Sequence, residues 1–149
     1  MTTITELLQQ EPATVAEKIL DIHPEQTPWL DEFAEVLDRT RAGRALGRIL
    51  EVWGLNQSDA AKLFGVSRQA VSKWLARGVP SERVEAVADL AAATDLLVRY
   101  VKRDRIPAVV RRPAAALGNH SLIHLAANSR TKEVLAACRA MFAFSRAMT

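Results

Sequence analysis

Residues 57–76 read QSDAAKLFGVSRQAVSKWLA, and this stretch decides the fold of the chain. Gly65 stands near its middle, where a sharp turn needs a backbone conformation that only glycine adopts at low cost. Apolar side chains recur on both sides of that turn, at spacings that place them on the inner faces of two short helices: Ala60, Phe64, Val66, Val71 and Trp74. The stretch therefore predicts two helices that cross over a shared core.

The outer face of this unit is polar and basic. In a helix-turn-helix the second helix lies in the major groove of DNA, where arginine and glutamine side chains reach base edges. Side chains and helix N-termini around them bind phosphates. The predicted DNA-binding residues are Gln57, Ser67, Arg68, Gln69, Ser72, Lys73 and Arg77. Phosphate contacts of lower specificity are expected from Arg44, Arg48 and Lys62.

The composition favours a helical globular chain. Of the 149 residues, 49% are hydrophobic and only 5% aromatic, alanine is abundant, and there are six glycines. No alternation of apolar and polar residues indicates a strand. We therefore predict an all-α fold. Its parts are an N-terminal helical region, a helix-turn-helix DNA-binding domain and a small helical C-terminal domain.

Charge is distributed unevenly along the chain. Residues 1–40 carry nine acids and two bases, whereas residues 41–80 carry seven bases and two acids, and residues 81–149 eleven bases and six acids. A basic middle is expected of a surface that contacts phosphate, and an acidic segment should avoid such a surface. The acidic segment either lies against a basic face, of its own chain or of a partner, or forms a solvated outer face.

Start and stop signals divide the chain into regions. Asn56 and Ser67 each precede a predicted helix and can cap it. Gly43 is interpreted as a break between a helix that begins near Pro28 and the next helix, over 44–53. Further helices are expected at 3–10, 12–22, 81–102, 106–110, 121–127 and 131–147. The resulting division is an acidic region over 1–42, a DNA-binding domain with a long linking helix over 43–104, and a C-terminal domain over 105–149.

No set of residues suited to catalysis or metal binding stands out. His120 and His124 have the spacing of a zinc pair, but no glutamate follows the first and no cysteine cluster supplies further ligands. Cys138 falls on an apolar stripe and is interpreted as a small buried hydrophobe. Glycines are too sparse for a phosphate-cradling loop. We expect no catalytic residue, no metal, no cofactor and hence no enzyme.

The stretch over 107–142, PAVVRRPAAALGNHSLIHLAANSRTKEVLAACRAMF, resembles the C-terminal toxin-binding domain of Xre/MbcA/ParS-type antitoxins. The matching elements are Pro113, Leu117-Gly118, the apolar centre over 122–125 and Glu133-Val134-Leu135. Two departures occur: Val109-Val110 replaces an aromatic residue, and Gly118-Asn119-His120-Ser121 replaces Gly-x-x-Pro. With the first stretch, which resembles Xre/Cro-type helix-turn-helix domains, the resemblance covers about residues 44–145.

The resemblance implies a protein that binds and blocks a toxin through its C-terminal domain. The toxin is often a RES-domain enzyme that degrades NAD or transfers ADP-ribose, and the helix-turn-helix represses the shared operon. By the same resemblance, the toxin-facing surface comprises the last helix and the loop before it: Arg111, Arg112, Leu117, Gly118, Arg139 and Arg146. The alternative is that these residues only close the core and form a dimer.

The sequence thus predicts a homodimeric antitoxin that binds double-stranded operator DNA and a protein toxin. A dimer contact through the wide apolar face of the helix over 81–102 is an added hypothesis. The alternatives are a stand-alone repressor and a docking protein that does not bind DNA. A single cysteine fits a reducing compartment, and no long apolar run or leader pattern occurs. We therefore expect a cytoplasmic protein without a membrane partner.

Overall fold

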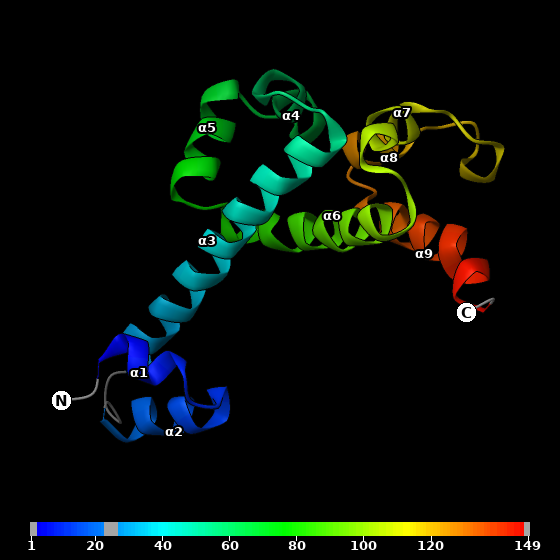
Figure 1. The fold of residues 1–149 in the computed structure, drawn as a ribbon. Coiled ribbons are helices and arrows are strands. Elements are labelled where there is room, and N and C mark those ends of the chain that lie inside the picture. Colours follow the sequence, from blue (N-terminus) through cyan, green and yellow to red (C-terminus); the bar gives the residue numbers. More distant parts are fainter. Residues whose placement is uncertain (1–2, 23–26, 148–149) are drawn as a thin grey trace. The chain divides into compact units, whose positions relative to one another are not determined.

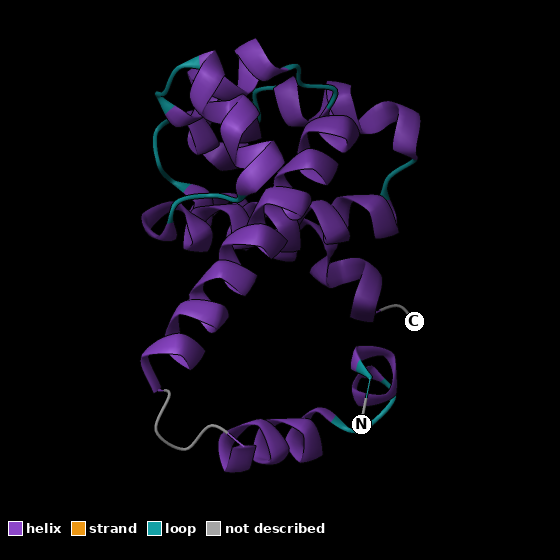
Figure 2. Ribbon diagram, turned by 90° about the vertical axis from the view of Figure 1, so that its left-hand side faces the viewer, coloured by secondary structure: helices purple, strands orange, loops and turns teal. Residues whose placement is uncertain are grey.

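The structure, a computed structural model, describes residues 3–22 and 27–147, and the side chains of all of these except 27 and 144–147. Every regular element in this part of the chain is a helix, and loops join the helices (Figures 1 and 2). The all-α prediction is therefore confirmed. Among the described helices, none combines the length and apolar character needed to cross a bilayer.

The helices follow the predicted order, with one exception described below. In chain order they are α1 (Ile4–Leu8), α2 (Pro12–Ile22), α3 (Thr27–Trp53), α4 (Gln57–Phe64), α5 (Arg68–Arg77), α6 (Ser81–Tyr100), a 3₁₀ turn (Arg103–Arg105), α7 (Ile106–Arg111), a second 3₁₀ turn (Ala115–Leu117), α8 (Leu122–Ala127) and α9 (Thr131–Ala147). They form two compact units, Met1–Glu35 and Val36–Thr149. The predicted domain boundaries near residues 42 and 105 stay predictions.

The first unit contains α1, α2 and the start of α3. A capping box begins α1: the Thr3 hydroxyl accepts from the Glu6 N–H, and the Glu6 carboxylate accepts from the Thr3 N–H. No residue of α1 or α2 is buried. This unit therefore has well-formed helix ends but very little core of its own.

Helix α3 runs without interruption through Gly43, so the predicted break at this glycine is wrong. A Cβ atom at Gly43 would lie 2.6 Å from the carbonyl oxygen of Trp74 and 3.2 Å from the Cα of Gly78. The glycine therefore allows α3 to pass close to the backbone at the end of α5. It serves close packing inside a helix and not the end of one.

The core of the second unit is built from buried side chains of α3 to α9. Helix α6 packs along α9, and α4 packs against both α5 and α8 (Figure 1). Tyr100 of α6 stacks on Phe142 of α9, with ring centroids 4.8 Å apart. The largest side chains that are almost fully buried are Trp53, Leu46, Leu90, Leu97, Ile106 and Leu122. One continuous apolar core thus joins the α4–α5 pair to the C-terminal helices.

A buried hydrogen bond fixes the largest of these side chains. The indole Nε1 of Trp53 donates to the Thr94 hydroxyl over 2.9 Å, and that hydroxyl donates to the Leu90 carbonyl over 2.7 Å. Both Trp53 and Thr94 are fully buried. Each of these buried side-chain groups has a hydrogen-bond partner, which offsets the cost of burying it, and the bond links α3 to α6.

Candidate nucleic-acid interface and C-terminal surface

The ends of α4 and α5 are set by local hydrogen bonds. Asn56 caps α4 in a capping box with Asp59, and the Ser67 hydroxyl accepts from the Ala70 N–H at the start of α5. Gly65 ends α4 in the left-handed conformation, with φ of 65°. The predicted caps and the predicted glycine turn are confirmed. Together they determine where α5 begins and which of its side chains face outward.

The inner face of α5 is anchored by two buried side chains. Val71 is fully buried, and Trp74 packs edge to face against Phe64 of α4, with ring centroids 5.6 Å apart. The Arg83 guanidinium lies over the Trp74 ring at 5.8 Å and donates to the Phe64 carbonyl over 2.9 Å. These contacts leave the opposite face of α5 to solvent.

That opposite face carries the predicted DNA-binding side chains. Gln57, at the start of α4, is half-buried; the exposed residues are Ser67, Arg68, Gln69, Ser72, Lys73 and Arg77. Positions 68, 69, 72 and 73 lie on one side of α5, because side chains four residues apart share a helix face. Within the described part of the chain, no hydrogen bond or ion pair engages the side chains at 68, 69, 72, 73 and 77. The structure therefore brings the predicted residues of α5 together on one exposed surface.

Several other basic residues bind their own chain. Arg48, predicted to contact phosphate, pairs with Asp95 of α6. Arg39 donates from Nε to the Val79 carbonyl over 2.9 Å. Of the basic residues in the middle region, Arg48 is therefore engaged within the chain, whereas Arg44 and Lys62 are exposed.

Arg111 bonds to the end of α3, a position that the sequence did not predict. Its Nη1 donates to the carbonyls of Trp53 (2.8 Å) and Pro107 (2.7 Å), and its Nη2 donates to the carbonyl of Gly54 (2.8 Å). A helix C-terminus leaves carbonyls without partners, and a cation there is favourable. Arg111 thus fastens α7 to the helix that precedes the α4–α5 pair. Its predicted role toward a toxin stays a prediction.

We expect Arg111→Ala to lower the free energy of unfolding by about 1.5–3 kcal/mol, because three charged hydrogen bonds are lost, one of them to the partly buried carbonyl of Trp53. The measurement is urea unfolding followed by circular dichroism. Arg112→Ala is the matched control: the neighbouring residue is exposed, and its removal should change stability by no more than about 0.5 kcal/mol. Equal effects of the two substitutions would show that the Arg111 bonds do not contribute.

The predicted toxin-facing residues do not gather at one place. Leu117 and Gly118 line a shallow groove of about 570 Å³ beside α9. Arg112 and Arg139 are exposed, Arg111 faces the end of α3, and the side chain of Arg146 lies outside the described residues. The groove is also lined by His120, Leu125, Arg130 and Glu133 and by three alanines of α9 that the sequence did not single out, Ala136, Ala137 and Ala140.

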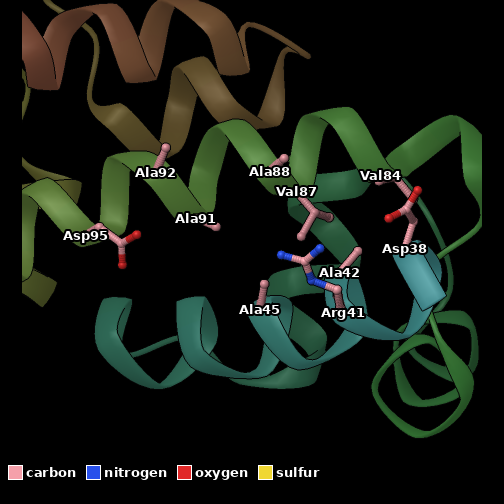
Figure 3. Close-up of a pocket in the computed structure, with 10 residues that line it drawn as sticks. All are labelled: Asp38, Arg41, Ala42, Ala45, Val84, Val87, Ala88, Ala91, Ala92 and Asp95. Atoms are coloured by element: carbon pink, nitrogen blue, oxygen red, sulfur yellow. The ribbon is translucent and has the colours of Figure 1, made fainter. Parts of the chain in front are cut away.

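A second groove lies between α3 and α6 (Figure 3). It has a volume of about 410 Å³ and a floor of alanine and valine side chains from both helices, including Ala42, Ala45 and Ala91. Asp38, Arg41 and Asp95 are the charged residues that line it. Small apolar side chains of this kind fit another helix better than a small polar ligand.

The residues that the sequence offered for reactive or metal-binding chemistry are Cys138, His120 and His124. Burial raises the pKa of the Cys138 thiol to about 11, so the thiolate that could react is scarce at neutral pH. The rings of His120 and His124 stack with centroids 4.2 Å apart. Over residues 3–22 and 27–147, no group of three or more potential ligands could hold a metal ion.

Comparison with known proteins gives one fold relationship. No family model matches the chain, and no curated protein sequence matches it significantly. A chain in the crystal structure of the M. tuberculosis MbcT-MbcA toxin-antitoxin complex is similar in fold, with a TM-score of 0.55. The identity is 22%, and the alignment covers 66% of this chain and 91% of that chain. The two chains therefore share an all-helical fold, and this chain has about a third of its length outside the alignment.

Proposed function

We propose that the protein is the antitoxin of a toxin–antitoxin pair. It binds operator DNA through α4 and α5, a helix-turn-helix, and it binds a protein toxin through its C-terminal helices. The observation that carries this proposal is the fold likeness to a chain of a toxin–antitoxin complex, which extends over 91% of that chain. The resemblance of residues 107–142 to antitoxin C-terminal domains supports it from the sequence alone.

DNA binding in this proposal rests on the exposed face of α5. Arg68 and Gln69 stand in its first turn, where a recognition helix reaches base edges in the major groove. Arginine pairs in bidentate fashion with guanine, and glutamine with adenine. Ser72 and Lys73 lie one turn further, in reach of a base or a phosphate. Binding to the promoter of its own operon would then repress transcription.

Toxin binding in this proposal rests on the α9 groove. Its alanine side chains Ala136, Ala137 and Ala140 leave room for an inserted apolar side chain, and Arg130 and Glu133 can orient a polar partner at the rim. Arg130 and Glu133 form an ion pair with each other. A partner must therefore either break this pair or bind both side chains while they stay paired. The toxin class that the sequence resemblance implies is a RES-domain enzyme that consumes NAD.

The test is co-expression with the protein encoded by the neighbouring gene, scored as rescue of growth. Wild type should restore growth, and Ala136→Glu together with Ala140→Glu should abolish rescue, because two charges then fill the groove. Ala108→Glu, on the exposed side of α7, is the matched control and should rescue fully. Rescue by all variants would contradict the groove assignment.

The alternatives give different patterns in the same experiment. A stand-alone repressor binds its promoter in a gel-shift assay but never rescues growth. A docking protein without DNA binding rescues growth but does not shift promoter DNA at concentrations up to about 1 μM, where a specific complex is already saturated and non-specific binding is only beginning. Only the proposed antitoxin gives both results.

A further inference from the structure

We infer that Arg83 is a positioning residue for DNA recognition. It fixes α5 relative to α4, and so determines where Arg68 and Gln69 lie, without contacting DNA itself. The inference rests on the proposed DNA-binding function and deepens it. Arg83 lies in the first turn of α6 and is half-buried. Within the described part of the chain no acid pairs with it, so its charge is available to the neighbouring helices.

Arg83 contacts both helices of the α4–α5 pair, one on each side of the turn at Gly65. Its Nη1 donates to the carbonyl of Phe64, the last residue of α4, over 2.9 Å. Its guanidinium also lies over the ring of Trp74 of α5, 5.8 Å from the ring centroid. Trp74 is buried and packs edge to face on the Phe64 ring. One side chain thus holds the end of α4 and the buried anchor of α5 at the same time.

The helix ends explain why an arginine at this place contacts α4. The turn after α4 pairs the carbonyls of Ala61 and Lys62 with backbone N–H groups, and Arg83 supplies the partner of the Phe64 carbonyl. A cation is favourable at such a C-terminus, where carbonyls lack partners within the helix. In the first turn of its own helix, by contrast, an arginine meets the positive end of the dipole. The position of Arg83 is therefore favourable toward α4 and not toward α6.

Arg68 and Gln69 lie in the chain between the two groups that Arg83 holds. A binding constellation needs its side chains within about 0.5 Å of the productive place, and residues behind them provide that support. If the contact between Phe64 and Trp74 loosens, the first turn of α5 shifts, although its cap and its exposed side chains stay the same. The consequence is a loss of sequence preference without a loss of general attraction to phosphate.

The test is fluorescence anisotropy of the full-length wild type and Arg83→Met with two DNA duplexes. One is the sequence that wild type selects from a random library, and the other is a scrambled sequence. The ratio of the two affinities should fall about tenfold or more, since misplaced base contacts are worth at least that much. Affinity for the scrambled duplex should change by less than about threefold, and the slope of log K against log salt should stay the same, because no phosphate contact is lost.

Arg99→Met is the matched control, because it makes the same substitution on the same helix. Arg99 is exposed and also lies over an aromatic ring, that of Tyr100, at 5.4 Å. It is about 24 Å along α6 from Arg83, and its loss should leave the ratio unchanged. Arg83→Lys keeps the charge but not the planar fork, so its ratio should stay well below that of wild type. It is also the variant to use if urea unfolding shows that Arg83→Met does not fold.

Nuclear magnetic resonance of the free proteins adds a measurement without DNA: the amides of the first turn of α5 should shift in Arg83→Met and not in Arg99→Met. Unshifted α5 amides, an unchanged ratio in Arg83→Met or a full ratio in Arg83→Lys would overturn the inference. So would an equal loss of affinity for both duplexes with a slope reduced by about one, which marks a phosphate contact. A wild type that prefers no sequence would instead contradict the proposed function, and this result is distinguishable because it requires no substitution.

Discussion

Gly43→Ala should lower the free energy of unfolding by about 1–3 kcal/mol, the range for forcing extra atoms into a packed interior. The new methyl group would stand 2.6 Å from the Trp74 carbonyl oxygen and 3.2 Å from the Gly78 Cα. Both contacts are with backbone atoms, which cannot rotate away as a side chain does. Relief therefore requires α3 and the end of α5 to move apart, and chemical denaturation will measure the loss.

Gly47→Ala is the control for this substitution, and its expected effect has the opposite sign. Gly47 lies four residues further along the same helix, and a Cβ there would contact only the Cδ2 of Leu75, at an ordinary 3.7 Å. Replacing a helical glycine by alanine then stabilises the protein by up to about 1 kcal/mol. If both substitutions stabilise, the close approach at Gly43 is not a constraint in solution.

Under the proposed role of α5 as a recognition helix, Arg68→Ala should weaken binding to the preferred operator by about 10- to 100-fold and flatten the preference among sequences, since a bidentate contact to guanine would be lost. Arg68 is exposed at the first position of α5, and its removal leaves the Ser67 cap and the core untouched. The measurement is fluorescence anisotropy with the operator and with a panel of single-base variants. Retention of the full preference would contradict the assignment of Arg68 to a base edge.

Comparison of Lys62→Ala with Arg68→Ala distinguishes a contact with a base from electrostatic attraction to the DNA backbone. Lys62 is exposed on α4. Loss of a phosphate contact there would weaken binding to all DNA sequences alike and reduce the slope of log K against log salt by about one. The sequence preference should not change. Loss of preference in this variant would show that α4, and not α5, reads the bases.

Local signals were sufficient to predict the α4–α5 pair. Asn56, Ser67 and Gly65 act on the backbone within three or four residues of themselves, so their roles are visible in the sequence. The burial of Val71 and Trp74 follows from helical spacing in the same way. The exposed face of α5 was therefore predictable, because the helix ends and the buried positions together leave only that face to solvent.

Roles set by distant partners were not predictable. Gly43 looks like a helix end in the sequence, because a glycine that admits a neighbouring backbone and one that stops a helix are the same residue. Arg111 bonds to carbonyls at Trp53 and Gly54, more than fifty positions away, and nothing nearby in the sequence marks it for this role. The α9 groove likewise depends on Ala136 and Ala140 lying next to a loop that precedes them.

Helix α4 contacts both α5, which carries the exposed basic face, and α8, which contributes Leu125 to the α9 groove, so one eight-residue helix connects the two candidate surfaces. Thermodynamic linkage then constrains regulation: any factor by which bound DNA changes the affinity for a protein at the C-terminal helices must equal the factor by which that protein changes the affinity for DNA. Measuring operator affinity with and without the partner therefore also gives the effect of the operator on partner binding. A toxin that shifts α8 against α4 would act as corepressor or inducer according to the sign of that single coupling free energy.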